Sequence, residues 1–451
     1  YNIIIVLYLK LSQLNIYNRI TLEKDLIMKK KILSLIFATT IGATVMAPTA
    51  DAAVKPTDKL DAVFYGAQYR NDLIKADLDK INTDVITFGY RVTDFDKSKY
   101  PTDLVRKIPS NSKAYFYTDI AHYDNMNGIQ KYVASDKNTY YINTRTPGTT
   151  VISIGKSDNN TKLVEEAKKK KLGVYLGLPM SKHYTESNKN WLPDRQFLKA
   201  NEVATQQFID KYNKSVDGFY LTTEMPVRDN ASWQPVYDIY NMQTKLVNKV
   251  SPGKITLMSP YLASRKTDNG TCPAGSGVSQ YQAGVKKLLS YANGTNLLII
   301  PQDGIGTDTT ALRADRSTRH CMTTEDAFAA MSKVGGNRLL VNVEAMNPGY
   351  KTPTGGKVRT PSNIKRFDQQ NAATAPYVSG KISYMWNNVS NKQEVGLKGM
   401  VGAEKYMGKG GGGIYQIAQK AKSSPVKSTT QSVYQPVNGM SSLSSKPWWR
   451  R

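Results

Sequence analysis

The chain has 451 residues, of which 40% are hydrophobic and 22% charged, and its formal net charge is +25. This is the composition of a globular protein that is long enough for one large core plus excursions. No internal apolar run reaches the roughly 18 residues that a membrane-spanning helix needs, so we expect no such helix in the mature protein.

The N-terminal region has the layout of an export signal rather than of a folded element. Residues 28–52 combine a basic start, an apolar segment and a small-x-small site, which predicts a signal peptide cleaved between Ala52 and Ala53. No Cys stands at this site, which argues against a lipid anchor. Residues 1–27 do not begin with Met, and we interpret them as translated upstream sequence. The protein is therefore expected to be secreted or periplasmic.

The expected export bears on whether the two cysteines, Cys272 and Cys321, form a disulfide. An oxidising compartment favours a disulfide between the two loops that hold them, and two separate buried thiols are the alternative. The three histidines and two cysteines show no metal-binding spacing, so we expect neither a metal nor a cofactor. The positive charge is suited to a polyanion, such as an acidic polysaccharide, or belongs to a solvated surface without a particular partner.

From residue 61 onwards, apolar runs alternate with amphipathic stretches. The predicted strands are Asp61–Gly66, Thr83–Tyr90, Leu172–Pro179, a run from Val216, Ile255–Pro260, Asn296–Pro301, Leu339–Val343 and Ile382–Trp386. The predicted helices lie near residues 73–81, 161–171, 201–212, 236–250, 281–292, 324–334 and 364–375. From the third strand on, strands recur about every 40 residues, which is typical of βα units and a parallel sheet.

Eight such strands predict an α/β fold, a closed (β/α)8 barrel over residues 53–405. An open doubly wound sheet is the rival, weakened because no G-x-G-x-x-G follows the first strand. Residues 91–160 are polar and irregular, and we expect an insertion there, after the second strand, that contains a hairpin. Residues 406–451 include a glycine run and a Ser/Thr/Pro/Lys-rich stretch, which predicts a flexible basic tail.

Barrel enzymes keep their chemistry at the carboxyl ends of the strands, so the residues that follow each strand are the site candidates. Carboxylates, amides and aromatic rings are mixed there, as a sugar site requires. In strand order they are Gln68, Tyr69 and Arg70; Tyr90 and Arg91; His183 and Tyr184; Glu224; Tyr261; Gln302 and Asp303; Glu344; and Trp386 and Asn387.

Two of these carboxylates, Glu224 and Glu344, end strands on opposite sides of the predicted barrel. Glycosidases use a carboxylic acid to protonate the leaving oxygen and a second carboxylate as nucleophile or base. Asp303 is the third candidate, either as the partner of Glu224 or as a ligand of a substrate hydroxyl. Alternatively, these carboxylates cap helices or pair with Arg70 or Arg91.

Several stretches together resemble a bacterial family of exported, largely uncharacterised barrel domains that are regarded as glycoside hydrolases. They are Leu172–Leu178, Gly218–Glu224, Ser259–Tyr261, Pro301–Gly306 and Asn342–Glu344, and the resemblance spans about residues 61–390. That family is similar to the clan of retaining glycosidases, which implies Glu224 as acid/base and Glu344 as nucleophile. The clan has Asn before its acid/base Glu where this chain has Thr223, which strengthens Gln302 and Asp303 as alternatives.

The sequence thus predicts a secreted glycoside hydrolase of the retaining type that cleaves a polysaccharide, an anionic one included. The other site candidates, Gln68, Tyr69, Arg70, Tyr90, Tyr184, Tyr261, Gln302, Trp386 and Asn387, would hold the sugar. Two alternatives remain open: a non-catalytic barrel that binds glycan, and an envelope or DNA adhesin that acts through its charge.

Overall fold

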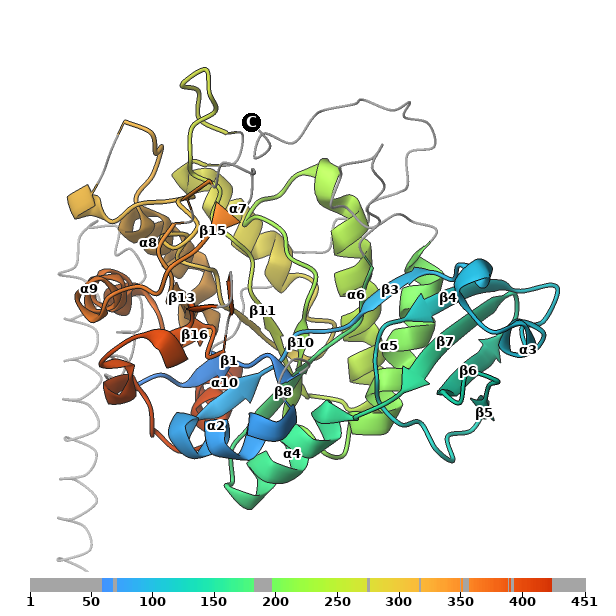
Figure 1. Cartoon of the computed structure of the whole chain (residues 1–451). Helices are drawn as coiled ribbons and strands as arrows, with labels where there is room; N and C mark the ends of the chain where they lie inside the picture. Colours follow the sequence, from blue (N-terminus) through green and yellow to red (C-terminus); the bar gives the residue numbers. More distant parts are fainter. Residues whose placement is uncertain are drawn as a thin grey trace, which may run out of the picture. The chain divides into compact units, whose positions relative to one another are not determined.

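The computed structural model describes residues 59–67, 71–181, 197–273, 276–315, 318–348, 350–351, 357–387, 389–390 and 393–423 (Figure 1). The predicted upstream segment, the signal peptide and residues 424–451 of the predicted tail lie outside these ranges. Within them, no helix has the length and apolar character needed to cross a membrane.

Eight parallel strands form a closed barrel. Their order in the sheet is β12-β11-β10-β8-β2-β1-β16-β13, and parallel bridges Ile299–Leu339 and Gln302–Asn342 join its two ends. The strands are β1 (Ala62–Phe64), β2 (Asp84–Ile86), β8 (Val174–Gly177), β10 (Gly218–Leu221), β11 (Ile255–Met258), β12 (Asn296–Ile299), β13 (Val341–Glu344) and β16 (Lys381–Tyr384). The predicted (β/α)8 barrel is confirmed.

Helices connect consecutive strands and cover the outside of the barrel (Figure 1). They are α2 (Ile74–Ile81), α4 (Asn159–Lys169), α5 (Leu198–Tyr212), α6 (Gln234–Val250), α7 (Val278–Leu289), α8 (Thr324–Gly335) and α9 (Ile364–Thr374). Because successive strand residues point to opposite faces, the strands feed two cores. Leu298, Leu340 and their neighbours fill the lumen, whereas Leu297, Leu339 and their neighbours pack against the helices.

The insertion is more regular than the sequence indicated. A six-stranded mixed sheet, in the order β5-β6-β7-β4-β3-β9, replaces the expected irregular segment with a hairpin. Its strands are β3 (Arg91–Asp94), β4 (Lys113–Tyr117), β5 (Ile129–Val133), β6 (Thr139–Thr146), β7 (Thr149–Gly155) and β9 (Met180–Ser181), with the short helix α3 (Thr102–Val105). Helix α5 ties this sheet to the barrel, since Asn143 Nδ2 donates to Gln207 Oε1 at 2.8 Å and Arg145 pairs with Asp210 at 2.6 Å.

The amino ends of the barrel strands are closed by helix α10 (Gly413–Ser423). Its residues Ile414 and Ile417 belong to the lumen cluster, and burying each such side chain is worth about 1.5–3 kcal/mol. The helix begins on Asp84, which accepts hydrogen bonds from the backbone N–H groups of Gly412 (2.8 Å) and Ile414 (3.2 Å). The predicted start of the flexible tail at residue 406 is therefore wrong for residues 406–423, which are part of the fold.

The remaining elements are short strand pairs and 3-10 turns in the connecting segments. Two antiparallel pairs follow β13 and β16: β14 (Tyr350–Lys351) with β15 (Lys357–Val358), and β17 (Val389–Ser390) with β18 (Gln393–Glu394). The 3-10 turns are η2 (Asn71–Leu73), η3 (Lys97–Lys99), η5 (Ala231–Trp233), η6 (Arg313–Asp315), η7 (Gly336–Arg338), η8 (Ala375–Tyr377), η9 (Leu397–Gly399) and η10 (Ala403–Tyr406).

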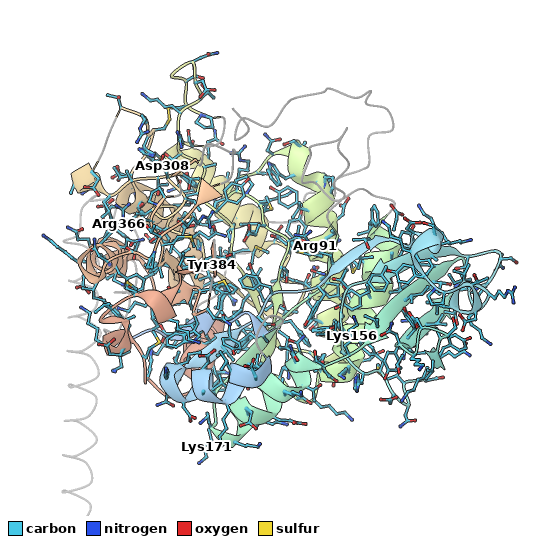
Figure 2. All side chains as sticks on the ribbon, in the orientation of Figure 1. Arg91, Lys156, Lys171, Asp308, Arg366 and Tyr384 are labelled. Carbon is cyan, nitrogen blue, oxygen red and sulfur yellow. A yellow bond between two sulfur atoms is a disulfide. The ribbon has the colours of Figure 1, made fainter. Side chains whose placement is uncertain are left out.

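The predicted disulfide is confirmed. Cys272 and Cys321 are bonded, with their Cα atoms 5.7 Å apart, and they join the loop after β11 to the segment before α8. A hydrogen bond of 2.6 Å from Met322 N to Ser264 Oγ and an ion pair of 2.8 Å between Arg265 and Asp308 connect the same loops. Figure 2 labels Asp308 in the loop after β12.

Candidate active site

Polar side chains line the lumen just beyond its apolar core. Along β12 the inward residues Leu298 and Ile300 are followed, two positions on, by Gln302, which keeps the same register. Gln302 Nε2 donates to Glu224 Oε1 at 3.2 Å and to the Ser259 carbonyl at 3.4 Å. The ends of β10, β11 and β12 therefore meet at one place, as the sequence predicted for Glu224 and Gln302.

Glu224 is exposed, while the chain on both sides of it is buried. Strand β10 ends at Leu221, and Glu224 lies three residues further on. It has the same strand register as Tyr220, whose side chain belongs to the lumen core. The carboxylate contributes to the raised pKa of Tyr240 after the larger effect of burial, which places the two groups near each other. The Tyr240 hydroxyl in turn bonds the carbonyl of Thr223, so the backbone that presents Glu224 is fixed from α6.

Glu344 is almost fully buried, with 2% of its surface exposed. Thr307 donates its N–H to Glu344 Oε2 at 2.8 Å and its hydroxyl to both carboxylate oxygens at 3.2 Å. Gly306 makes this loop possible, because a Cβ there would lie 2.8 Å from the Glu344 Cβ. Burial raises the pKa of Glu344 to about 7, although Arg359 and the Thr307 donors oppose the rise.

Asp303 faces away from the lumen. It follows Gln302 directly, so its side chain points to the opposite side of the strand, toward the helices. Its Oδ1 accepts from Ile305 N at 3.2 Å and Glu344 N at 3.4 Å, and its Oδ2 accepts from Gln370 Nε2 of α9 at 2.8 Å. Burial, and then the Glu344 charge, raise the pKa of Asp303. The fully buried Asp303 thus lies behind Glu344 and is bonded to α9, and its catalytic role stays a prediction.

Beneath the polar layer lies a floor of aromatic rings that the sequence analysis missed. Phe64 and Phe88 stack with centroids 5.0 Å apart, Tyr220 meets Phe64 edge-on at 5.0 Å, and Tyr384 lies 5.7 Å from Phe88. Phe88 and Tyr384 are half-buried, whereas the other two are buried. Figure 2 labels Tyr384 among the barrel strands. The inward period-two register of β2 and β16 was the signal that could have identified them.

Three of the predicted sugar contacts pack within the fold. Tyr90 belongs to the outer core and meets Tyr117 of the insertion at 6.4 Å, because the chain leaves the barrel there to enter β3. Trp386 also belongs to the core between the barrel and its helices, because Tyr384 and Met385 are the last residues at the end of β16 that face the lumen. Asn387 Oδ1 accepts from Gly66 N at 2.8 Å and joins the ends of β16 and β1. All three are buried, and their roles as sugar contacts stay predictions.

The remaining candidates divide into placed and unplaced residues. Tyr261 is half-buried beside Glu224, and Arg91 is exposed at the start of β3. Gln68, Tyr69, Arg70, His183 and Tyr184 lie outside the described residues. Among the described residues, no group of three or more His, Cys, Asp or Glu side chains is arranged to hold a metal ion.

A family model described as "Domain of unknown function (DUF4434)" matches residues 129–393, and no curated protein matches the chain. A candidate alpha-L-fucosidase from Bacteroides thetaiotaomicron is 13% identical, with a TM-score of 0.46 over 84% of this chain and 98% of that one. A beta-glucosidase from Thermotoga maritima is 9% identical, with a TM-score of 0.33 over 59% and 79%.

A sugar phosphate isomerase/epimerase from Parabacteroides distasonis is 11% identical, with a TM-score of 0.35 over 83% and 98% of the two chains. At these identities and TM-scores, the similarities assign no activity to this chain.

Proposed function

We propose that this chain, which belongs to the DUF4434 family, is a glycoside hydrolase that uses Glu224 and Glu344. The observation that supports this most directly is the hydrogen-bonded arrangement at the barrel rim. Glu224 and Glu344 end β10 and β13, three strands apart, and Gln302 lies between them in the same inward register. Two carboxylates on either side of a site are what glycoside hydrolysis requires.

The proposed mechanism retains the anomeric configuration. Glu344 attacks the anomeric carbon and forms an ester with the sugar, while Glu224 gives its proton to the leaving oxygen as the glycosidic bond breaks. Glu224 then takes a proton from water, whose oxygen attacks the same carbon and releases Glu344. Phe88 and Tyr384 offer the sugar an apolar floor.

This assignment has a consequence for pH. Glu344 attacks only as a carboxylate, and its pKa is raised to about 7 by burial. The rate should therefore increase as the pH rises through about 7, because the ionised fraction of Glu344 increases. If Glu344 were the proton donor instead, the rate would decrease over the same range.

The test is hydrolysis of a panel of cell-envelope and matrix glycans by the mature protein, with product analysis. Glu224→Gln and Glu344→Gln should both abolish turnover, and Glu404→Gln, an exposed glutamate after β16, is the matched control. A dinitrophenyl glycoside of the hit sugar separates the roles, since its good leaving group rescues loss of the acid and not loss of the nucleophile. Turnover that survives both substitutions would refute the proposal.

The proposed enzyme is exported, because residues 28–52 have the layout of a signal peptide. Its substrate would be a polysaccharide of the cell envelope or the surrounding matrix.

One observation favours a second candidate function, a barrel that binds glycan without cleaving it. Glu344 exposes only 2% of its surface and is held by Thr307, which suits a structural carboxylate as well as a nucleophile. Binding of a glycan without any product after prolonged incubation would support this alternative.

A further inference from the structure

The loop after β10 runs beside the loop after β11 and places two charged residues around one tyrosine. Tyr261 N donates to the Met225 carbonyl at 3.0 Å, and Val227 N donates to the Tyr261 carbonyl at 3.0 Å. Glu224 comes just before this pair of hydrogen bonds and Arg228 just after it. The half-buried side chain of Tyr261, on the loop after β11, therefore lies between Glu224 and Arg228 of the loop after β10.

Among the described residues, no carboxylate forms an ion pair with Arg228. Arg228 is half-buried, and its Nε is buried without a hydrogen bond. The adjacent Asp229 lies 4.0 Å from Lys287 instead. By comparison, the half-buried Lys211 pairs with Asp158 at 2.6 Å.

The side chains around Arg228 are largely aromatic. Tyr237, Tyr261 and Tyr281 lie near it, burial raises the pKa of each phenol, and all three are therefore neutral at physiological pH. The backbone of Arg228 is fixed, since the Tyr237 hydroxyl donates to its carbonyl at 2.5 Å and a Cβ on Gly284 of α7 would lie 2.6 Å from its nitrogen. A partly desolvated guanidinium held in this way is unfavourable alone and favourable with an anion.

A second ring completes the arrangement. Trp233, half-buried in η5, meets Tyr261 at a centroid distance of 6.5 Å and an angle of 77°. Aromatic rings of this kind pack against the apolar faces of sugars, while a guanidinium binds a carboxylate or sulfate through paired N–H groups.

We propose that Arg228, Tyr261 and Trp233 form a subsite for an acidic sugar, whose carboxylate or sulfate group pairs with Arg228. The subsite lies next to Glu224, the proposed proton donor, so it would hold the sugar on the leaving-group side of the cleaved bond. This inference rests on the proposed function and adds to it the chemical class of one substrate unit.

The test is calorimetric titration of the full chain with a panel of acidic oligosaccharides, each paired with a neutral form. Uronic acid probes are paired with their carboxyl-reduced forms, and sulfated probes with their desulfated forms, which separates the two sources of negative charge. We expect at least one acidic probe to bind about tenfold or more tightly than its neutral partner. Arg228→Gln should remove this difference.

Arg106→Gln, an exposed arginine after α3, is the matched control and should retain the preference. Arg228→Lys keeps the charge without the paired donors, so it should give an intermediate preference even if the Gln variant folds poorly. Equal binding of every acidic and neutral pair would overturn the inference alone. If the unchanged protein binds and cleaves no glycan of the panel, the proposed function would be refuted as well.

Discussion

The two ends of the barrel both carry buried carboxylates, but the groups that surround and cover these carboxylates differ. At the amino ends, Asp84 accepts hydrogen bonds from Gly173 N (2.7 Å), Gly412 N and Ile414 N, and Asp61 is ion-paired with Lys409. Helix α10 then covers them. At the carboxyl ends, Glu224 is exposed, and the Glu344 carboxylate accepts hydrogen bonds from Thr307.

The comparison shows that burial of an acid does not by itself indicate chemistry. Asp84 is as buried as Glu344, and burial raises the pKa of both. What differs is the neighbourhood: backbone donors and helix α10 surround Asp84, whereas Thr307, Arg359 and Asp303 surround Glu344. We therefore expect residues at the carboxyl ends of the strands to serve the function of the barrel and residues at the amino ends to serve its stability. These are called the function end and the stability end below.

The largest expected effect separates the two ends directly. Glu344→Gln should lower the rate of hydrolysis about a thousandfold or more with little change in the melting temperature. Asp84→Asn should do the reverse, lowering the melting temperature and leaving kcat unchanged. The measurements are initial rates and thermal unfolding of both variants. A Glu344→Gln protein with wild-type turnover would break the comparison.

The second effect concerns the stability end. Asp84→Ala removes the acceptor of three backbone N–H groups and should lower the free energy of unfolding by about 3 kcal/mol. Urea unfolding followed by circular dichroism measures this change. Asp79→Ala, an exposed aspartate of α2, is the control and should leave the midpoint close to that of the unchanged protein.

A smaller effect is expected at Asp303. Asp303→Asn keeps an oxygen for the N–H groups of Ile305 and Glu344 but loses the acceptor for Gln370, so kcat should decrease about tenfold at constant KM. A thousandfold loss of kcat would support the prediction of Asp303 as a catalytic group.

The smallest effect is expected at Thr307. Thr307→Val removes the hydroxyl donor to Glu344 and leaves the N–H, so the carboxylate form is less stabilised and the pKa of Glu344 should rise by about half a unit. The pH dependence of kcat/KM measures this as an acidic limb that moves to higher pH. An unchanged limb would mean that Glu344 does not control the rate.

The barrel was predictable because apolar runs ended by Pro or Gly recur with a nearly constant period. The insertion was not, because its strands are polar: β5 exposes most of its residues, and β6 ends in Asn143–Thr146. The glycine run at 410–413 was also misinterpreted. Gly410 and Gly412 adopt positive φ and turn the chain into α10, so here glycine marks the start of a packed helix.

The ends of the strands indicated which residues lie near the site. The strand register at each position decided whether the side chain faces the lumen or the helices. Gln302 and Asp303 are neighbours in sequence, yet one faces Glu224 and the other faces α9. Tyr90 and Trp386 show the same limit, since the chain turns away from the lumen just before each of them. Phe88 and Tyr384 were missed because they lie inside the strand runs rather than after them.

The position of α10 also defines where the chain can be shortened. A fragment that stops at residue 405, the predicted end of the barrel, would lack helix α10 and open Ile382 and Leu298 to water. For protein production, tags and fusion partners therefore belong beyond Ser423.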